Sequence, residues 1–300
     1  MNSSKVLLRF LILIVMMAAG FAFGQVWVRS VDVPCYVTNN AGQFVTDLKQ
    51  EDFVVHDNGK IRKITAFKEK LQAPLSVALL LDRSRSVTQA FPLLQSASQK
   101  FLGSIIRKNI DRSCVVAFDS HVYLLQDWTD DVSLLDQAIG KLTASGGTAL
   151  FDAIYKTCRD KFPLEQDQDR TKVLLLVTDG EDTTSHATLK QVTDMVSQSG
   201  VIIYVLGIHA QDSLNPRSQQ GKRVLSEFKD MTGGDVLYQR EHEANLEDLF
   251  AQIERELRNE YIVTFVSNDE PDNTFHKLKI ETTRKDLVVR ARKKGYLASG

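Results

Sequence analysis

Four uninterrupted apolar runs dominate the middle of the chain and restrict what it can fold into. They lie within residues 76–81, 114–118, 172–177 and 201–206. Apolar runs of this length, without polar alternation, are typical of strands whose two faces are both covered. Between the runs, apolar residues recur at helical spacing, as at Leu94, Ala97, Phe101 and Ile105. Strands that alternate with helices predict an α/β fold with a doubly wound, mostly parallel sheet flanked by helices.

The two flanks of this α/β region have a different pattern, typical of antiparallel β structure. Residues 27–70 and 261–289 contain short strands, and Asp57-Asn58-Gly59 is a strong hairpin signal. Each flank has only about 40 residues, which is too few to bury a sufficient core alone. We therefore expect the flanks to pack together as a small β-sandwich-like module. The predicted divisions are 1–24, 25–72, 73–260 and 261–300.

The first 24 residues are typical of an export signal. Lys5 and Arg9 precede an uncharged apolar stretch, and Ala22-Phe23-Gly24 supplies small residues for cleavage before Gln25. This predicts a secreted or periplasmic protein, with an uncleaved N-terminal anchor as the alternative. No other segment is apolar enough to span a bilayer. The chain carries 37 basic and 38 acidic residues, and this balance argues against nucleic acid as a partner.

Three cysteines, Cys35, Cys114 and Cys158, are widely spaced, and no pair has the spacing of metal ligands. The sequence allows one disulfide and one free thiol after export. Cys114 lies in an apolar strand, where a buried and inert thiol is the simpler interpretation. The sequence leaves the pairing open.

Oxygen-bearing side chains follow the apolar strands at three places. The first run ends in Asp82-x-Ser84-x-Ser86, Thr148 follows a pair of glycines, and Asp179 stands in Thr178-Asp179-Gly180. Hard oxygen ligands of this kind suit Mg²⁺. The carboxyl ends of parallel strands meet at one edge of a sheet, where ligands bind in open α/β folds. The sequence therefore predicts a divalent-cation site formed by three loops.

These residues, in this order, resemble the metal-ion-dependent adhesion site of von Willebrand factor type A domains and integrin I domains. The resemblance covers about residues 74–260, and the flanks are similar to an exported bacterial subgroup frequent in acidobacteria. It implies Mg²⁺ or Mn²⁺ as cofactor and a protein partner that presents Asp or Glu. It also implies that Ser84 and Ser86 bind the metal directly, that Thr148 does so in the ligand-bound state, and that Asp82 and Asp179 act largely through water.

The rim of the predicted site contains residues with two interpretations. The positions of Arg83 and Arg85 are often small in the family; these side chains either extend into solvent or attract an acidic partner. Their charge could also weaken metal binding. Gly147 and Asp182 are further candidates for the rim, although Asp182 also fits a solvated acidic loop. Asp152 either contacts the metal ligands without binding the metal itself or is an acid favoured by the dipole in the first turn of a helix, which is the simpler interpretation.

Two other classes of function, an enzyme and a scaffold without metal, compete with metal-dependent binding. A phosphoryl-transfer hydrolase would use Asp82 as nucleophile, but residues 83–86 offer no second acid. A serine hydrolase needs a base beside its serine, and no Gly-x-Ser-x-Gly motif is present. A scaffold without metal is the third alternative, and the full set of oxygen ligands argues against it. We therefore predict that the protein is not an enzyme; its oligomeric state stays open.

Overall fold

The four apolar runs form the centre of a six-stranded sheet. A computed structural model describes residues 29–163, 169–207, 216–238, 246–267, 273–292 and 294–298. The strand order is β10-β9-β8-β5-β6-β7, and every neighbouring pair is parallel except β6 and β7. The predicted α/β class, with its mostly parallel sheet, is confirmed. The strands are β5 (Leu75–Asp82), β6 (Arg112–Phe118), β7 (Val122–Thr129), β8 (Thr171–Thr178), β9 (Ile202–Gly207) and β10 (Val236–Tyr238).

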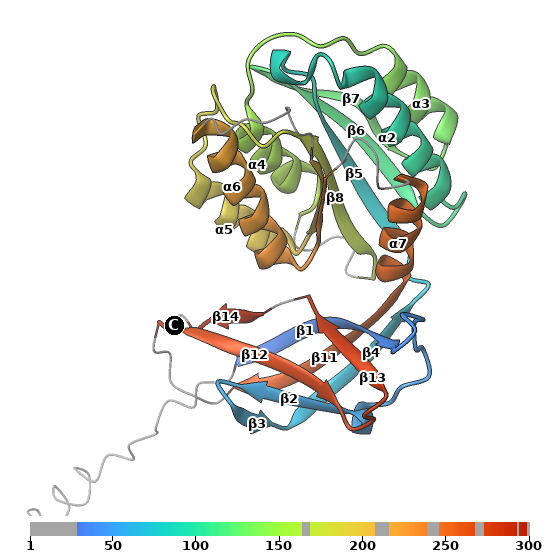
Figure 1. Cartoon of the computed structure of the whole chain (residues 1–300), viewed down its shortest axis with the longest axis vertical. Coiled ribbons are helices and arrows are strands. Elements are labelled where there is room, and N and C mark those ends of the chain that lie inside the picture. The colour runs from blue at the N-terminus through green and yellow to red at the C-terminus, as the bar shows by residue number, and fades with distance from the viewer. Residues whose placement is uncertain are drawn as a thin grey trace, which may run out of the picture.

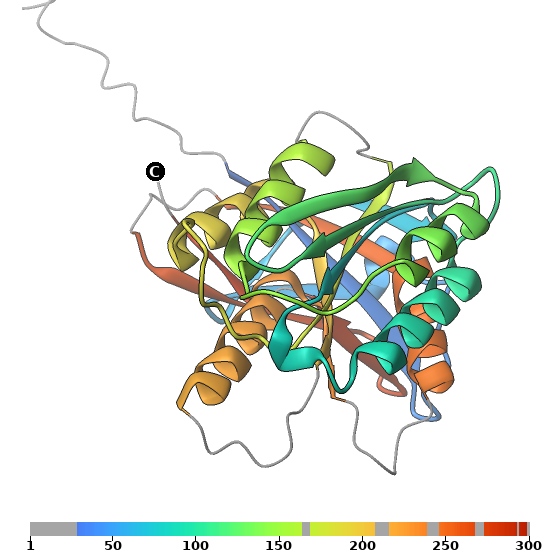
Figure 2. The same ribbon diagram turned by 90° about the horizontal axis from the view of Figure 1, so that it is seen from above.

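Helices cover both faces of this sheet, as Figure 2 shows from above. On β5, Leu79 and Leu81 face one apolar core, and Ala78 and Leu80 face the other. Alternate residues of a strand point to opposite faces, so a strand between two helical layers must be apolar throughout. The first core is covered by α2 (Phe91–Ile105), α3 (Val132–Gly140) and α7 (Leu246–Arg258). The second is covered by α4 (Leu150–Lys161), α5 (Leu189–Ser199) and α6 (Pro216–Thr232).

The N- and C-terminal strands form two further antiparallel sheets, below the α/β part in Figure 1. The first has the order β13-β1-β11-β4 and the second β14-β12-β2-β3, so both ends of the chain contribute to each sheet. We call this part the β module. Its strands are β1 (Arg29–Asn39), β2 (Phe53–Asp57), β3 (Lys60–Arg62), β4 (Ile64–Leu71), β11 (Asn259–Ser267), β12 (Phe275–Thr282), β13 (Leu287–Ala291) and β14 (Gly295–Leu297).

The predicted hairpin joins β2 to β3. Asp57 pairs with Lys60, and the two residues between them, Asn58 and Gly59, have φ angles of 48° and 80°. A two-residue hairpin turn of type I′ requires positive φ angles at both central residues, and Asn-Gly adopts them readily. The hairpin prediction is therefore confirmed.

The β module joins the α/β part at the end of the sheet where β5 begins. Only residues 72–74 separate β4 from β5, and α7 runs directly into β11. The side chain of Arg292 lies buried at this junction. Its Nε donates to Glu260 Oε1 at 2.7 Å, and its Nη1 and Nη2 donate to Tyr204 Oη and the Glu256 carbonyl, each at 2.9 Å. Residues of both parts thus share one buried polar network.

A second buried arginine fixes the end of α7. Arg258 Nη2 donates to Asp111 Oδ2 at 2.9 Å, and Arg107 Nε donates to the same oxygen at 2.9 Å. Burial, the largest influence, raises the pKa of Asp111, but the hydrogen bonds from Arg107 and Arg258 outweigh it and lower the pKa to about 2. The ionised carboxylate is therefore the form that the fold stabilises.

This depressed pKa predicts an acid-dependent loss of stability. Asp111 ionises near pH 3.9 in the unfolded chain and near pH 2 in the folded protein, so its contribution is complete above about pH 4 and falls as the pH drops toward 2. Relative to wild type, Asp111→Asn should lower the free energy of unfolding at pH 7 and have a smaller effect at pH 2. Urea titrations at both pH values measure this. An equal effect at both would contradict it.

All three cysteines are buried and free, so the disulfide that the sequence allowed does not form in this structure. Burial raises the pKa of each thiol to about 12, and the prediction of an inert Cys114 fits this environment. The predicted export signal, residues 1–24, lies outside the described residues. Among the helices that the structure describes, none is both long and apolar enough to cross a membrane.

Candidate functional site

The loop after β5 begins with a fully buried carboxylate. Asp82 is the last residue of β5 and has 0% of its surface exposed. Its Oδ1 accepts from Ser84 N at 2.8 Å, and its Oδ2 accepts from Thr178 Oγ1 at 2.6 Å. Burial, followed by the nearby charge of Asp179, raises the pKa of Asp82 to about 7. The hydroxyl oxygens of Ser84 and Ser86 lie 2.9 Å apart. This loop therefore gathers the first three predicted ligands.

The glycine-rich loop before α4 is hydrogen-bonded to the loop after β5. Ser145 N donates to the Arg83 carbonyl at 2.6 Å, and Arg85 N donates to the Gly146 carbonyl at 3.3 Å. Gly146 has a φ of 81°, and a Cβ there would lie 3.0 Å from Asp119 Cβ. Only glycine adopts this positive φ and leaves room for Asp119 without strain. The backbone of this loop thus runs beside the Asp82-x-Ser84-x-Ser86 segment.

Thr148 links this second loop to the third, which follows β8. Its backbone N donates to Thr183 Oγ1 at 2.9 Å, and its carbonyl accepts from Thr183 N and Thr184 N at 2.8 and 3.0 Å. Asp179 begins the third loop, and its Oδ1 accepts from Glu181 N at 3.0 Å. The structure therefore brings the three loops together at the carboxyl ends of β5 and β8. Among the described residues no three His, Cys, Asp or Glu side chains gather, so a cation here would depend on hydroxyl oxygens.

The two arginines of the first loop have different environments. Arg83 Nη2 donates to Ser145 Oγ at 2.8 Å, its Nε lies 3.5 Å from Asp119 Oδ2, and its guanidinium lies over the ring of Tyr123. The interpretation that this side chain extends into solvent is therefore wrong, because neighbouring loops hold it. Arg85 is exposed, as that interpretation expected.

The acidic residues near the third loop contact backbone and hydroxyl donors. Asp182 Oδ1 accepts from Phe151 N at 3.2 Å and from Ser185 Oγ at 2.6 Å, so it is not a freely solvated acid. Asp152 Oδ1 accepts from His186 N and Ala187 N at 3.1 and 2.8 Å. Burial raises the pKa of Asp152, but these two hydrogen bonds outweigh it and leave the pKa below its ordinary value. Both carboxylates anchor the third loop to α4.

The sequence interpretation missed three residues that hold the loops. Thr178 donates to Asp82, as described above, and Ser120 Oγ accepts from Gly147 N at 2.9 Å. Asp119 Oδ1 accepts from His121 N at 2.9 Å, and its carbonyl accepts from Ala149 N at 2.6 Å. Asp119 and Ser120 directly follow β6, so their position after a parallel strand was the available signal. The rim residue Gly147 is packed, because a Cβ there would lie 3.0 Å from Ser120 Oγ.

Gly180 fixes the path of the third loop, and replacing it should damage the fold. Its φ is 85°, and an added Cβ would lie 2.8 Å from Leu225 Cδ1 and 3.0 Å from the Gly221 carbonyl carbon. Gly180→Ala combines an unfavourable φ with overpacking, so we expect a loss of about 2–4 kcal/mol in the free energy of unfolding. Gly200→Ala is the matched control, because its φ of 68° is also positive but nothing lies within 4 Å. Equal losses in urea titrations of both variants would contradict this prediction.

Comparisons with known proteins place this fold in a family. A family model, the von Willebrand factor type A domain, matches residues 76–252. Calcium-activated chloride channel regulator 1 of Bos taurus is 29% identical over 183 residues, which cover 59% of this chain and only 19% of that relative.

Two solved structures are similar to this chain at low identity. Proximal thread matrix protein 1 from the mussel byssus, with a zinc-occupied MIDAS motif, is 16% identical with a TM-score of 0.50; the match covers 67% of this chain and 50% of that one. The vWF domain of the type V pili tip protein Mfa5 from Porphyromonas gingivalis is 12% identical with a TM-score of 0.47. This match covers 62% of this chain and 97% of that one. Because the family model matches more than half of this chain, the chain belongs to the von Willebrand factor type A domain family.

Proposed function

We propose that this protein binds an acidic residue of a protein partner through a divalent cation. One observation carries the proposal: the Ser84 and Ser86 hydroxyls lie 2.9 Å apart beside the anchored Asp82 carboxylate. Two serines at positions i and i+2 that point the same way can occupy adjacent corners of a metal's coordination shell. The hydrogen bonds among the three loops support this proposal, because they join the backbone of Thr148 to the loop that Asp179 begins.

The donor set fits Mg²⁺ or Mn²⁺. It consists only of hard oxygens, three hydroxyls and two carboxylates, as these ions prefer. The residues that would hold the ion are Asp82, Ser84, Ser86, Thr148 and Asp179. Asp179 lies close enough to raise the pKa of Asp82, and a bound cation would offset the repulsion between their charges. When bound, the ion would supply an electrophilic centre for a carboxylate of another molecule.

The position of Asp82 argues against the alternative of a phosphoryl-transfer hydrolase. Its side chain is fully buried, and hydrogen bonds from Ser84 N and Thr178 Oγ1 occupy both oxygens. A nucleophilic carboxylate needs an oxygen free to approach the substrate. We therefore propose a binding module and not an enzyme.

The remaining features fit an exported binding protein. We propose that residues 1–24 direct export to the periplasm or the cell exterior, and that residues 73–260 form the binding domain. The flanks of residues 25–72 and 261–300 would then support it, and we propose that the chain belongs to the exported acidobacterial subgroup that these flanks resemble. Arg85, exposed beside the candidate site, would attract an acidic partner, with Gly147 and Asp182 near the rim.

The proposed function is tested by capture of proteins from the exported fraction of the source cells. Immobilised wild-type protein should retain a partner in Mg²⁺ and release it in EDTA, and Asp82→Asn should retain much less of it at the same Mg²⁺ concentration. Replacing the partner's contacting Asp or Glu by its amide should abolish retention. A partner that binds equally in EDTA would contradict the proposal.

A further inference from the structure

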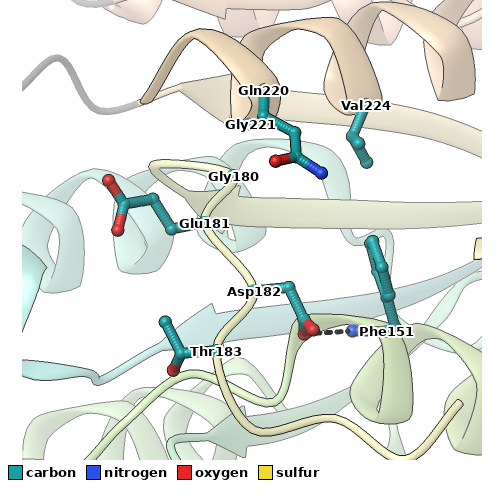
Figure 3. Close-up of a pocket in the computed structure, with 8 residues that line it drawn as sticks. All are labelled: Phe151, Gly180, Glu181, Asp182, Thr183, Gln220, Gly221 and Val224. Atoms are coloured by element: carbon teal, nitrogen blue, oxygen red, sulfur yellow. Dashed lines mark hydrogen bonds between the residues drawn. The ribbon is translucent and has the colours of Figure 1, made fainter. Parts of the chain in front are cut away.

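A cavity opens directly beside the third loop of the candidate site. It has a volume of about 340 Å³, and Figure 3 shows the residues that line it. Gly180, which follows Asp179 in the chain, forms part of its wall, so the cavity and the candidate metal site share one loop. Its volume lies at the lower end of the roughly 300–1,000 Å³ range of small-molecule sites. It therefore suits a single long side chain better than a large ligand.

The lining combines an apolar wall with polar groups. The ring of Phe151 and the side chain of Val224 lie together on one side, and the amide of Gln220 and the carboxylate of Asp182 complete it (Figure 3). Both hydrogen bonds that Asp182 accepts from described residues go to Oδ1. Its second oxygen, Oδ2, accepts no hydrogen bond from the described part of the chain. Among the residues that the structure describes, none that lines the cavity is basic.

This lining fits the side chain of lysine or arginine. Such a side chain buries its methylene stem against apolar surface and keeps its charged end on polar groups. A carboxylate is the strongest partner for that charge, and a neighbouring aromatic ring adds cation–π attraction. A carboxylate-bearing side chain, in contrast, would meet the negative charge of Asp182. The cavity thus favours a group whose charge is opposite to that of the carboxylate which the metal would bind.

We propose that this cavity is a second subsite, which takes a Lys or Arg side chain of the same partner whose acid binds the metal. The inference rests on the proposed function and makes it more specific. The partner would present an acidic and a basic residue close together on one surface, and the two contacts would fix its orientation. An acid alone would bind through the metal, with lower affinity and less selectivity.

The test uses a library of random 12-residue peptides displayed on phage, selected on the immobilised full chain in Mg²⁺ and eluted with EDTA. We expect the eluted peptides to share an acidic residue with a Lys or Arg at fixed spacing. A synthetic peptide in which that basic residue is replaced by Gln should bind at least about tenfold more weakly, as expected for the loss of one charge-assisted contact.

Two variants test whether the basic residue of the peptide binds in the cavity. Gln220→Lys puts a positive charge there from an exposed helix position, and Asp182→Asn keeps Oδ1 while removing the negative charge. Both should weaken the basic peptide about tenfold, and Gln220→Lys should leave the Gln peptide unchanged. Gln219→Lys, at the preceding residue of α6, adds the same charge but does not line the cavity, and it should change the binding of neither peptide.

Three results would overturn the inference. Selected peptides could contain an acid without a recurring Lys or Arg, or the Gln peptide could bind as tightly as the basic one. Gln220→Lys could also weaken both peptides equally. In each case binding would still depend on Mg²⁺ and on Asp82, so the proposed function would stand. If EDTA eluted no peptides, both the inference and the proposed function would fail.

Discussion

Asp82→Asn should reduce the affinity for Mg²⁺ by about 10–100-fold while leaving the fold intact, as is typical when a group that orients metal ligands is lost. The amide oxygen can still accept from Ser84 N, and the amide nitrogen can donate to Thr178 Oγ1, so the two hydrogen bonds of the native carboxylate have replacements. What disappears is the negative charge beside the candidate ion. Titration calorimetry with Mg²⁺ and Mn²⁺ measures the change directly.

Thermal unfolding gives an independent measurement of the same effect. An ion that binds only the folded protein stabilises it by about 2.7 kcal/mol at a concentration of one hundred times its Kd. Wild type should therefore unfold at a higher temperature in Mg²⁺ than in EDTA, and Asp82→Asn should lose most of this difference. Asp194→Asn, an exposed site on α5, removes the same charge and serves as the control. A wild-type protein that does not respond to either ion would favour a scaffold without metal.

Arg292→Met should have the largest effect on stability, a loss of about 3–5 kcal/mol in the free energy of unfolding. Arg292 lies buried at the junction, with its charge against Glu260 and its other nitrogens donating to Tyr204 and the Glu256 carbonyl. Methionine fills a similar volume but leaves the Glu260 carboxylate buried without its partner. The cost arises from that unpaired charge, since a buried pair contributes little net stability compared with apolar residues.

A double variant separates the unpaired charge from lost packing. Arg292→Met with Glu260→Gln removes both charges, so it should recover part of the stability lost in the single variant. Lys294→Met is the control, because its ion pair with Asp230 is exposed and should contribute no more than about 1 kcal/mol. Guanidinium titrations compare the four proteins. A double variant less stable than Arg292→Met alone would show that packing, not charge, dominates.

The regular parts of this fold were predictable because their signals are local. An apolar run between helices predicts a buried parallel strand, and β5, β6, β8 and β9 all formed where such a run occurs. The Asn58-Gly59 turn was predictable for the same reason, since two positive φ angles depend on the residues themselves. The order in which Asp82, Thr148 and Asp179 follow these elements then indicated which edge of the sheet to consider.

The contacts of individual polar side chains were less predictable. Arg83 was expected to extend into solvent, but Ser145 and Asp119 bind it from two other loops. The sequence was consistent with a solvated Asp182, but in the fold this residue accepts hydrogen bonds from Phe151 N and Ser185 Oγ. A hydrogen bond between residues distant in the chain depends on the path of both loops, and neither path is encoded by its neighbouring residues alone.

The sequence by itself determined the layers of this protein, its hairpin and the residues that could serve as metal ligands, because periodicity and turn propensity act over a few residues. Only the tertiary structure decided how the β module attaches, since the Arg292 network joins residues from four separate segments. It alone also placed a cavity between the third loop and α6, where Gly180 and Gly221 approach closely enough that a Cβ on either would clash. Such features exist only where distant segments meet, so they depend on packing that no local pattern specifies.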